Sequence, residues 1–567
     1  MLQIMKTNTI VRLIAALLCS SVLMTSCIKE GLPEGGSATN EQVGESPFAA
    51  DGVLTAMSTS IMTNYVDIGE HCDFGIASVF GATDRMVGDV FPTSGNMPDG
   101  NKYYDRWQWC LYTYNNKGLN DTGYGAPLIY YNYYNFIYTT NSAIGIFSTN
   151  PGPELGVAKA FRAFCFLDLA RMYDPLPAKA EGVAGTTKYE IPAEITGLTV
   201  PIVTESSTIE ELENNPRATR EEMFEFILAD LNEAEKLISE ANYKPAIIGM
   251  PSLAVVYGLK ARAYNWLGGF NESYENVPTG NEAYKLAAQY ARKAITASGC
   301  TIMTEAQYTD PITGFCKVNS AWMWGMQQST DTVLGNLHSW TAHMSTDALW
   351  GYGGGSQPGM NALMYNRIND TDFRKKVFNN PERDFSKIDP YTNLTEEEYE
   401  GGGDAMSSIA PYANFKFHTN NGEKYDYAVG NVTDIPLMRV EEMYFIEAEA
   451  TAHYDAAKGA ELLTAFMANR DSAYAIPADR DLIEEIIFQK RVEFWGEGVI
   501  FFDMKRLNIG MNNGDEGSTA PNDARFTTDG RAPWWNCVIP HSAVQQNQGL
   551  AGKNNPNVAQ TYMSKNI

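Results

Sequence analysis

A serine-centred segment is the closest approach to a catalytic motif in this 567-residue sequence. Residues 353–359 read GGGSQPG, which is similar to the G-x-S-x-G elbow that presents a serine nucleophile for acyl transfer. Pro358 stands where the second glycine of that motif must be, and no strand is predicted before it. The segment therefore does not predict a nucleophilic serine.

Histidine, cysteine and acidic residues form no recognisable catalytic or metal-binding pattern. His338 and His343 are five residues apart, so they cannot share a helix face as the H-E-x-x-H motif requires. No C-x-x-C pair occurs, and the DFG tripeptide at 73–75 lacks every other kinase motif. General-acid catalysis needs a convergent carboxylate pair in a cleft, which nothing in the sequence indicates. We therefore expect no enzyme, no catalytic residue, no metal site and no cofactor.

Aromatic side chains are the better candidates for ligand contacts. An aromatic face packs well against the C–H face of a pyranose ring, while Asn, Asp and Arg can take the hydroxyl groups. Trp322, Trp340, Trp350 and Tyr352 lie in a stretch that is rich in Gly and Asn. We predict that these residues contact a ligand. Each tryptophan could equally cover the core.

A turn-rich run near the N-terminus adds further candidates. Residues 84–109 bring together Arg85, Asn96, Asn101 and Trp107, which combine an aromatic ring with polar groups that can hydrogen-bond to hydroxyls. We predict that these residues contribute to the same ligand surface.

Helical periodicity predicts the elements that position these residues. Apolar residues recur at helical spacing over 122–148, 154–179, 219–238 and 253–299. The second of these segments ends at Pro175, and Thr219 with Glu222 has the spacing of a capping box. Small residues at Ala287, Ala291 and Ala294 allow close helix contact. Helical hairpins therefore recur, in a pattern that resembles tetratricopeptide units with widened turns.

The chain is predicted to divide into five segments. Residues 1–26 form a signal peptide, 27–50 a flexible tether, 51–300 a helical region, 301–435 a loop-rich insertion and 436–567 a second helical region. In the last segment, charged residues on two helices are expected to pair where apolar faces meet, and Gly498 to cap the second helix in a left-handed conformation.

The N-terminus has the features of an export signal. Lys6 and Arg12 precede an apolar stretch that is too short to span a bilayer, because a transmembrane helix needs roughly 20 apolar residues. Residues 23–27, LMTSC, resemble a bacterial lipobox, in which the cysteine is lipidated. We expect Cys27 to carry a lipid that anchors the chain to a membrane. An ordinary secretory leader is the alternative.

The overall charge excludes one class of partner. The formal net charge is −26, so the surface should repel nucleic acid and anionic lipid. No nucleic-acid partner is therefore expected. Cys165 lies in an apolar helical run and is predicted to be a buried thiol.

Several segments together resemble the RagB/SusD family of Bacteroidetes outer-membrane lipoproteins. In chain order, they are AKAFRAFCFLDLARMYDPLP, NDTDFRKKVF, LMRVEEMYFIEAEA, IIFQKRVEFWGEGVIFFDMKRLN and IPHSAVQQNQGL. The resemblance implies a mostly α-helical, tetratricopeptide-like scaffold with a loop-rich insertion that forms a ligand surface.

The resemblance also implies a function. Glycan-binding members hold their ligand at the cell surface and deliver it to a SusC-like TonB-dependent transporter in the outer membrane. We therefore expect a lipid-anchored, outward-facing glycan-binding protein. A RagB-like receptor for peptides is the main alternative, and an enzyme acting on the same nutrient is a third.

Overall fold

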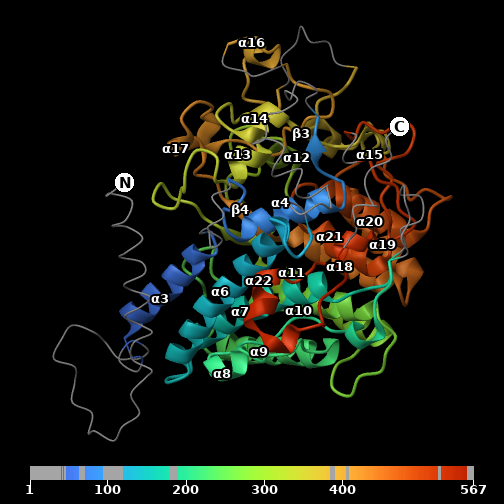
Figure 1. Cartoon of the computed structure of the whole chain (residues 1–567). Helices are drawn as coiled ribbons and strands as arrows, with labels where there is room; N and C mark the ends of the chain where they lie inside the picture. Colours follow the sequence, from blue (N-terminus) through green and yellow to red (C-terminus); the bar gives the residue numbers. More distant parts are fainter. Residues whose placement is uncertain are drawn as a thin grey trace, which may run out of the picture.

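The computed structural model describes Asn40, Val43 and residues 46–62, 71–93, 119–178, 189–382, 390–403, 408–521 and 525–557. Long helices form the lower and right-hand parts of the molecule in Figure 1. They are α6 (Gly125–Phe147), α7 (Pro153–Tyr173), α9 (Arg220–Glu240), α10 (Leu253–Gly268), α11 (Gly280–Ser298), α18 (Val440–Ala452), α19 (Ala456–Met467) and α20 (Leu482–Glu493). The predicted mostly α-helical fold is confirmed.

Neighbouring long helices pack in pairs, as the repeated hairpins predict. Helix α6 packs on α7, α7 on α9, α10 on α11, and α18 on α19. On α11, Ala287, Ala291 and Ala294 are fully buried, which lets this helix approach its neighbours closely. Helix α7 ends at Tyr173, two residues before Pro175, because proline cannot continue the hydrogen-bonding pattern.

Local signals set the start of α9. The backbone N–H of Glu222 donates to Thr219 Oγ1 (3.2 Å), and the backbone N–H of Thr219 donates to Glu222 Oε2 (2.8 Å). This reciprocal pair is the capping box that the sequence predicts. It satisfies two donors that would otherwise face solvent at the helix end.

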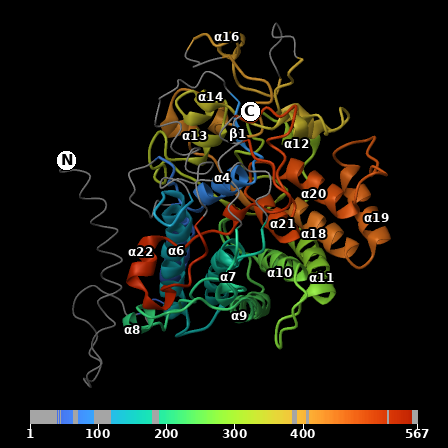
Figure 2. The ribbon, with the colours of Figure 1, turned by 45° about the vertical axis from the view of Figure 1, so that its right-hand side comes forward.

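Short elements fill the upper part of the molecule in both ribbon views (Figures 1 and 2). We call residues 301–435 the loop layer. Its elements are α12 (Glu305–Tyr308), β2 (Trp322–Met326), α13 (Trp340–Met344), α14 (Tyr352–Ser356), β3 (Pro358–Gly359), α15 (Ala362–Tyr365), η2 (Phe373–Val377), α16 (Glu396–Tyr399), η3 (Asn420–Gly422) and α17 (Tyr427–Gly430).

Two small antiparallel sheets attach the loop layer to the helices. Strand β2 pairs with β4 (Ile435–Arg439), with Trp322 opposite Arg439, and β1 (Phe91–Pro92) pairs with β3. Because β4 leads directly into α18, the β2–β4 pair fixes the loop layer to the C-terminal helices.

The remaining elements cover the helical scaffold. They are α3 (Pro47–Ser60), α4 (Ile76–Met86), η1 (Ala193–Ile195), α8 (Ile209–Leu212), α21 (Ile500–Leu507), η5 (Pro533–Trp535), α22 (His541–Gln546) and η6 (Gln548–Leu550). None of the helices in the described ranges is long and apolar enough to cross a membrane.

Buried ion pairs link α20 and the turn after it to strand β4, to the segment after α19 and to the loop layer. Arg470 Nε donates to Glu493 Oε2 (2.8 Å), Arg439 Nε donates to Glu497 Oε2 (2.8 Å), and Lys416 Nζ donates to Glu497 Oε1 (2.6 Å). All five side chains are nearly inaccessible to solvent. The predicted pairing between two helices is found only in part: Glu493 of α20 pairs with Arg439, which ends strand β4 and is not part of a helix.

The turn after α20 has the predicted left-handed glycine, although the helix ends earlier than predicted. Helix α20 ends at Glu493, four residues before the predicted end at Glu497. Gly498 has a φ of 74°, and a Cβ there would lie 2.5 Å from Phe80 Cβ. Glycine is therefore required at this position both for its left-handed backbone and for the close approach to α4.

The C-terminal end of α4 is held by residues that lie more than 400 positions away. The indole N–H groups of Trp534 and Trp535 both donate to the carbonyl of Met86 (3.2 and 2.8 Å). The indole N–H of Trp495 donates to Asp89 O (2.7 Å), and the backbone N–H of Gly498 donates to Asp84 Oδ2 (2.8 Å). This turn therefore joins the two ends of the chain.

The buried charged residues of α7 are paired, and its cysteine is a buried thiol. Arg162 Nε donates to Asp230 Oδ2 on α9 (2.7 Å), and Arg171 pairs with Asp168. Cys165 is fully buried and free, as predicted. Burial raises the pKa of its thiol, which keeps the group neutral.

Candidate ligand-binding face

Three of the predicted contact residues lie inside the protein. Trp322 and Trp340 are only 2% and 3% exposed, and Arg85 is 1% exposed. Trp322 lies in β2, and Trp340 contacts Phe417 edge-to-face with a centroid distance of 5.5 Å. Arg85 Nη1 donates to the carbonyl of Gly81 (2.9 Å). These three side chains are therefore buried within the protein and do not form its surface.

Trp350 differs from these residues because it is only partly buried. Its indole lies directly on the backbone of α17. A Cβ at Gly430 would lie 2.1 Å from Trp350 Cη2, so only glycine fits beneath the ring. This contact fixes the orientation of an aromatic side chain that reaches the surface of the loop layer.

Tyr352 is close to Trp350 in sequence and lies mostly beneath the surface. It is 7% exposed, and its hydroxyl is 2.5 Å from His71 Nδ1. The ring of His343 lies 5.0 Å from that of Tyr352, centroid to centroid. Tyr352 therefore belongs to a cluster of aromatic and imidazole rings, which we call the histidine cluster (His71, His338, His343 and Tyr352).

Two imidazoles of the histidine cluster, His338 and His343, favour the neutral form. Burial, reinforced by the nearby Arg85 charge, lowers the pKa of His343 to about 3. Its Nε2 lies 3.1 Å from the carbonyl of His71 and 3.0 Å from that of Leu337, so the neutral ring donates its N–H there. Burial and the neighbouring His71 also lower the pKa of His338. His338 and His343 therefore contribute uncharged aromatic rings to the cluster.

Two exposed tyrosines flank Trp350. Tyr425 is 55% exposed and Tyr427 is 42% exposed. The backbone N–H of Leu349 donates to the carbonyl of Lys424 (3.3 Å), which brings the Tyr425 segment beside Trp350, and Tyr427 begins α17. Sequence reasoning missed both residues. The segment EKYDYAVG, with two alternating tyrosines in an Asn- and Gly-rich stretch, carried the signal.

The other predicted site residues cannot be placed. Asn96, Asn101, Trp107 and the lipid-attachment residue Cys27 lie outside the described residues. Their proximity to Trp350 or to a membrane stays a prediction.

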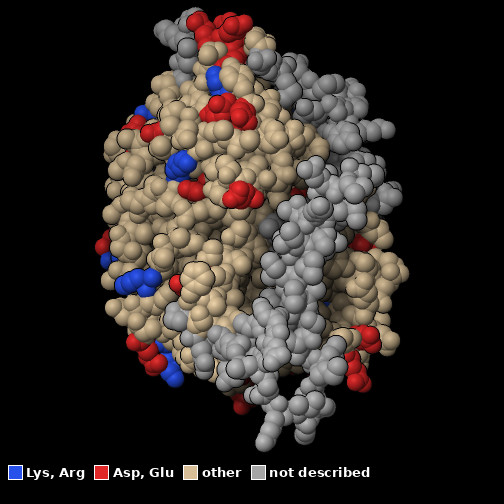
Figure 3. All heavy atoms as spheres, turned by 90° about the vertical axis from the view of Figure 1, so that its left-hand side faces the viewer, with Lys and Arg blue, Asp and Glu red and all other residues tan. Residues whose placement is uncertain are grey.

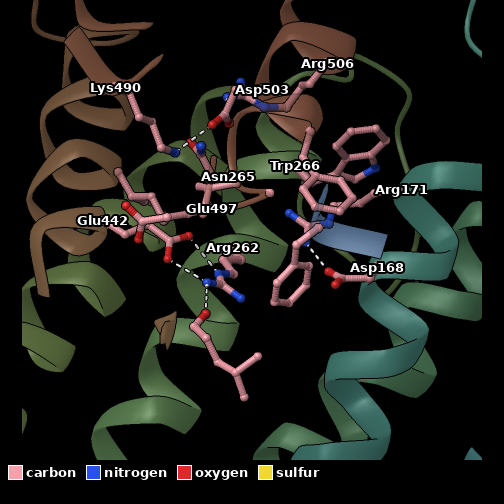
Figure 4. A pocket seen from close by; sticks show the side chains of 16 residues that line it. Asp168, Arg171, Arg262, Asn265, Trp266, Glu442, Lys490, Glu497, Asp503 and Arg506 are labelled. Carbon is pink, nitrogen blue, oxygen red and sulfur yellow. Dashed lines mark hydrogen bonds and ion pairs between the residues drawn. The ribbon is translucent and has the colours of Figure 1, made fainter. Parts of the chain in front are cut away.

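A second feature is a small polar cavity among the helices (Figure 4). Its volume is about 30 Å³, which is enough for one or two water molecules and far too small for a sugar. Four acidic and four basic side chains line it: Asp168, Glu442, Glu497, Asp503, Arg171, Arg262, Lys490 and Arg506. The charges form pairs, such as Arg262 Nε to Glu442 Oε1 at 2.7 Å. The cavity therefore belongs to the scaffold.

Carboxylates with shifted pKa values are also part of the scaffold. Burial raises the pKa of Glu441, whereas Glu493 has a lowered pKa because Arg470 and Arg439 oppose the effect of its burial. Both side chains are fully buried among arginines. Neither lines an open groove in the described part of the chain, so a substrate cannot reach them there.

One histidine–aspartate pair resembles part of a catalytic triad. His418 Nδ1 lies 2.5 Å from Asp347 Oδ2, and both side chains are only 1% exposed. Within the described ranges, no Ser, Thr or Cys side chain hydrogen-bonds to His418, so the nucleophile of a triad is missing there. Those ranges also contain no group of three or more His, Cys, Asp or Glu side chains that could hold a metal ion.

Comparisons with known proteins identify the family. The profile of the SusD family matches residues 350–557, and a second profile, described as starch-binding associating with outer membrane, matches residues 64–265. No curated protein matches the chain.

Solved structures share the fold over most of the chain. A SusD-like carbohydrate-binding protein from Bacteroides vulgatus is 21% identical, with a TM-score of 0.64 over 90% of this chain and 98% of that chain. A SusD-like protein from Bacteroides fragilis is 14% identical, with a TM-score of 0.62 over 92% and 99%. A structure described with a xylogluco-oligosaccharide is 17% identical, with a TM-score of 0.57 over 89% and 99%.

These matches agree with the helical scaffold and with the family motifs of the sequence. The two profiles cover separate parts of the chain, one in the N-terminal helices and the other from the loop layer to the C-terminal helices. The chain belongs to the SusD family.

Proposed function

We propose that this protein binds glycans at the cell surface and delivers them to a SusC-like TonB-dependent transporter in the outer membrane. The observation that supports this proposal best is the aromatic surface of the loop layer, formed by the exposed Tyr425 and Tyr427 and the partly buried Trp350. Aromatic faces pack well against the C–H faces of sugar rings, and the nearby charge of Lys424 is paired with Glu398.

Among the predicted contacts, Trp350 is the first candidate, and Tyr352 supports it through the histidine cluster. Trp107, Asn96 and Asn101 stay proposed contacts outside the described residues. Trp322, Trp340 and Arg85 could touch a ligand only if the residues that cover them moved. We therefore propose a supporting role for these three.

The proposed location combines a lipid on Cys27 with a flexible tether. Membership of the family and the outer-membrane association named in the second profile support this location. Wide areas of the face shown in Figure 3 carry few charged side chains, although the net charge of the chain is −26. Such a surface can lie against a transporter without a large electrostatic penalty.

Binding without catalysis is the proposed mode of action. The aromatic face offers stacking and hydrogen bonding, whereas the shifted carboxylates described above are buried away from it. A RagB-like receptor for peptides is the second candidate, because exposed tyrosines also bind peptides well.

A binding array of glycans and peptides tests the proposal directly. The full-length chain, solubilised in detergent, should bind neutral oligosaccharides, and chromatography should recover them unchanged. Tyr427→Ala should weaken this binding several-fold, because the variant removes an exposed ring beside Trp350. Tyr138→Ala is the matched control, since Tyr138 is 57% exposed but lies on α6, outside the loop layer.

Two outcomes would contradict the proposal. Binding to peptides alone would favour the RagB-like function. New reducing ends that copurify with the protein would show that it is an enzyme.

A further inference from the structure

An open groove lies at the end of the molecule opposite the loop layer. Helices α6, α8 and α22 border it, together with the backbone segment at Pro201 and Val203. Both ribbon views place α6, α8 and α22 below α13, α14 and α16, with α8 near the bottom of the molecule (Figures 1 and 2). The volume of the groove is about 350 Å³, within the range of small-molecule sites.

Three tyrosines of α6 form one wall of this groove. Tyr130 and Tyr134 are stacked with a centroid distance of 4.3 Å, and Tyr131 meets Tyr130 edge-to-face at 5.4 Å. The hydroxyl of Tyr134 donates to the carbonyl of Pro201 (2.7 Å), and the hydroxyl of Tyr131 lies 2.7 Å from Ser542 Oγ. These bonds hold the half-buried rings of Tyr131 and Tyr134 in place before any ligand arrives.

Polar side chains from three elements converge around this aromatic wall. They are Asn135 of α6, Glu213 at the end of α8 and Gln546 of α22. None of the three side chains hydrogen-bonds to another residue in the described ranges, so their donors and acceptors are available to a ligand. In contrast, Asn547 is fully used: its Oδ1 accepts from the backbone N–H of Asn215 (2.9 Å), and its Nδ2 donates to Asn215 O (2.6 Å).

The charges of the groove restrict its ligand. Among the described residues, no Lys or Arg lines it, and Glu213 is the one carboxylate of its lining. A phosphate or another anion would therefore meet no cation in this described lining and would be repelled by Glu213. A neutral ligand with several hydroxyl groups and an apolar ring face satisfies both the tyrosines and the unpaired amides.

We infer that this groove is a second binding site for a neutral oligosaccharide, separate from the loop layer. The chemical class of the ligand rests on the proposed function, whereas the location rests on the groove itself. Two separate sites allow one long glycan to be held at two points, so that the second contact forms at a high effective concentration.

The test uses two variants of the full-length chain that differ in one position along α22. Asn135→Ala/Gln546→Ala removes two amides that stabilise nothing else in the described structure. Asn135→Ala/Gln545→Ala is the matched control, because Gln545 is exposed on the same helix and does not line the groove. Calorimetry with maltoheptaose and with a xyloglucan heptasaccharide measures the number of sites and their affinities.

To separate the two sites, each groove variant is also made with Trp350→Ala. We expect two sites in the unmodified chain. In Trp350→Ala the loop-layer site should be about tenfold weaker, so that the groove site dominates the titration. Asn135→Ala/Gln546→Ala should weaken the groove site at least fivefold, whereas the control should weaken it less. Melting temperatures should agree within a few degrees among all variants.

The outcomes distinguish this inference from the proposed function. The second site alone would be overturned if the chain had one glycan site, if Trp350→Ala abolished binding there, and if Asn135→Ala/Gln546→Ala left that binding intact. Failure to bind any glycan of an array would contradict the proposed function and the second site together. Ile209, which is 76% exposed at the rim, provides a further check. If the chain captures a protein, if Ile209→Asp abolishes this capture, and if no glycan binds in the groove, the groove is a docking site for a partner protein.

Discussion

At the scale of single residues, exposure separates tryptophans that the sequence presents alike. Trp322 and Trp350 both lie in the loop layer, yet Trp322 is 2% exposed within β2, whereas Trp350 is only partly buried. Their removal should therefore have different consequences. A buried ring fills space in the core, and an exposed one is available for stacking.

Alanine substitutions at these two positions test the distinction. Trp322→Ala should destabilise the fold by roughly 3–5 kcal/mol, because it leaves a large cavity. Trp350→Ala should lower glycan affinity about tenfold and change the melting temperature much less. Calorimetry and thermal unfolding of both variants provide the measurements. An unchanged affinity in Trp350→Ala would remove this residue from the binding face.

Lys505 has an unusual environment for a lysine. It is fully buried in α21, and its Nζ donates to the carbonyl of Met172 (2.7 Å). Burial lowers the pKa of its ammonium group to about 7. An unfolded lysine has a pKa of roughly 10.4, so between these values the unfolded state binds more protons than the folded state. The Lys505 contribution to stability therefore increases as pH rises from about 7 to about 10.

Replacement by an isosteric apolar side chain tests this pH dependence. The melting temperature of the unmodified protein, measured against that of Lys505→Met, should rise between pH 7 and pH 10. The reason is that the buried ammonium group of Lys505 deprotonates in the folded state over this range. Lys458→Met on α19 is the control for an exposed lysine. A stability difference between protein and variant that is constant over this range would contradict the pKa assignment.

At the scale of elements, the sequence predicts local structure better than long-range pairing. The start of α9 follows from its capping box, and the end of α7 follows from Pro175. Both signals lie within a few residues of the helix end that they set. Strand β2 could not be predicted in the same way. Its partner β4 lies more than 100 residues later, and no short-range pattern records this pairing.

The candidate site was predictable only in part, for a related reason. Residue type indicates that tryptophan and arginine can bind a sugar, but exposure depends on what the rest of the chain places over them. Arg85 and Trp340 are covered by the fold, whereas Gly430 leaves room for Trp350. Tyr131 and Gln546 meet in the groove although their separation in sequence exceeds 400 residues.

Buried ion pairs between elements should matter far more than exposed ones. Arg470→Leu would leave Glu441 and Glu493 without a charge that both contact in the core. We expect a loss of about 3–5 kcal/mol of unfolding free energy, because a buried carboxylate without its partner is strongly destabilising. Chemical denaturation provides the measurement.

The matched control is Arg292→Leu. Arg292 pairs with Glu447, but the arginine side chain is 47% exposed, so its loss should cost less than about 1 kcal/mol. Equal effects of the two substitutions would show that burial of the ion pair is not the deciding factor.

At the scale of the whole molecule, the proposed anchor decides where the binding faces operate. Cys27→Ser should release the protein from membranes or block its maturation, because the lipid can no longer be attached. Fatty-acid labelling and membrane fractionation of the two proteins provide the measurement. An unlabelled, soluble protein without the substitution would contradict the lipoprotein prediction.

Orientation at the membrane needs a separate experiment. We expect proteases added to intact cells to digest the protein, because it is proposed to face the exterior. A periplasmic protein with the same type of anchor is the control. Full protection of both proteins would place this chain on the periplasmic side.

The bonds at the end of α4 also have a consequence for the order of folding. The carbonyl of Met86 accepts hydrogen bonds from two tryptophans that are synthesised 448 and 449 residues later. Contacts of such long sequence separation form slowly, because the intervening chain must first be brought together. The N-terminal helices can therefore complete their core only after almost the whole chain has been made. A chain that is interrupted before Trp534 exposes that unfinished core, which makes it a ready substrate for chaperones and proteases.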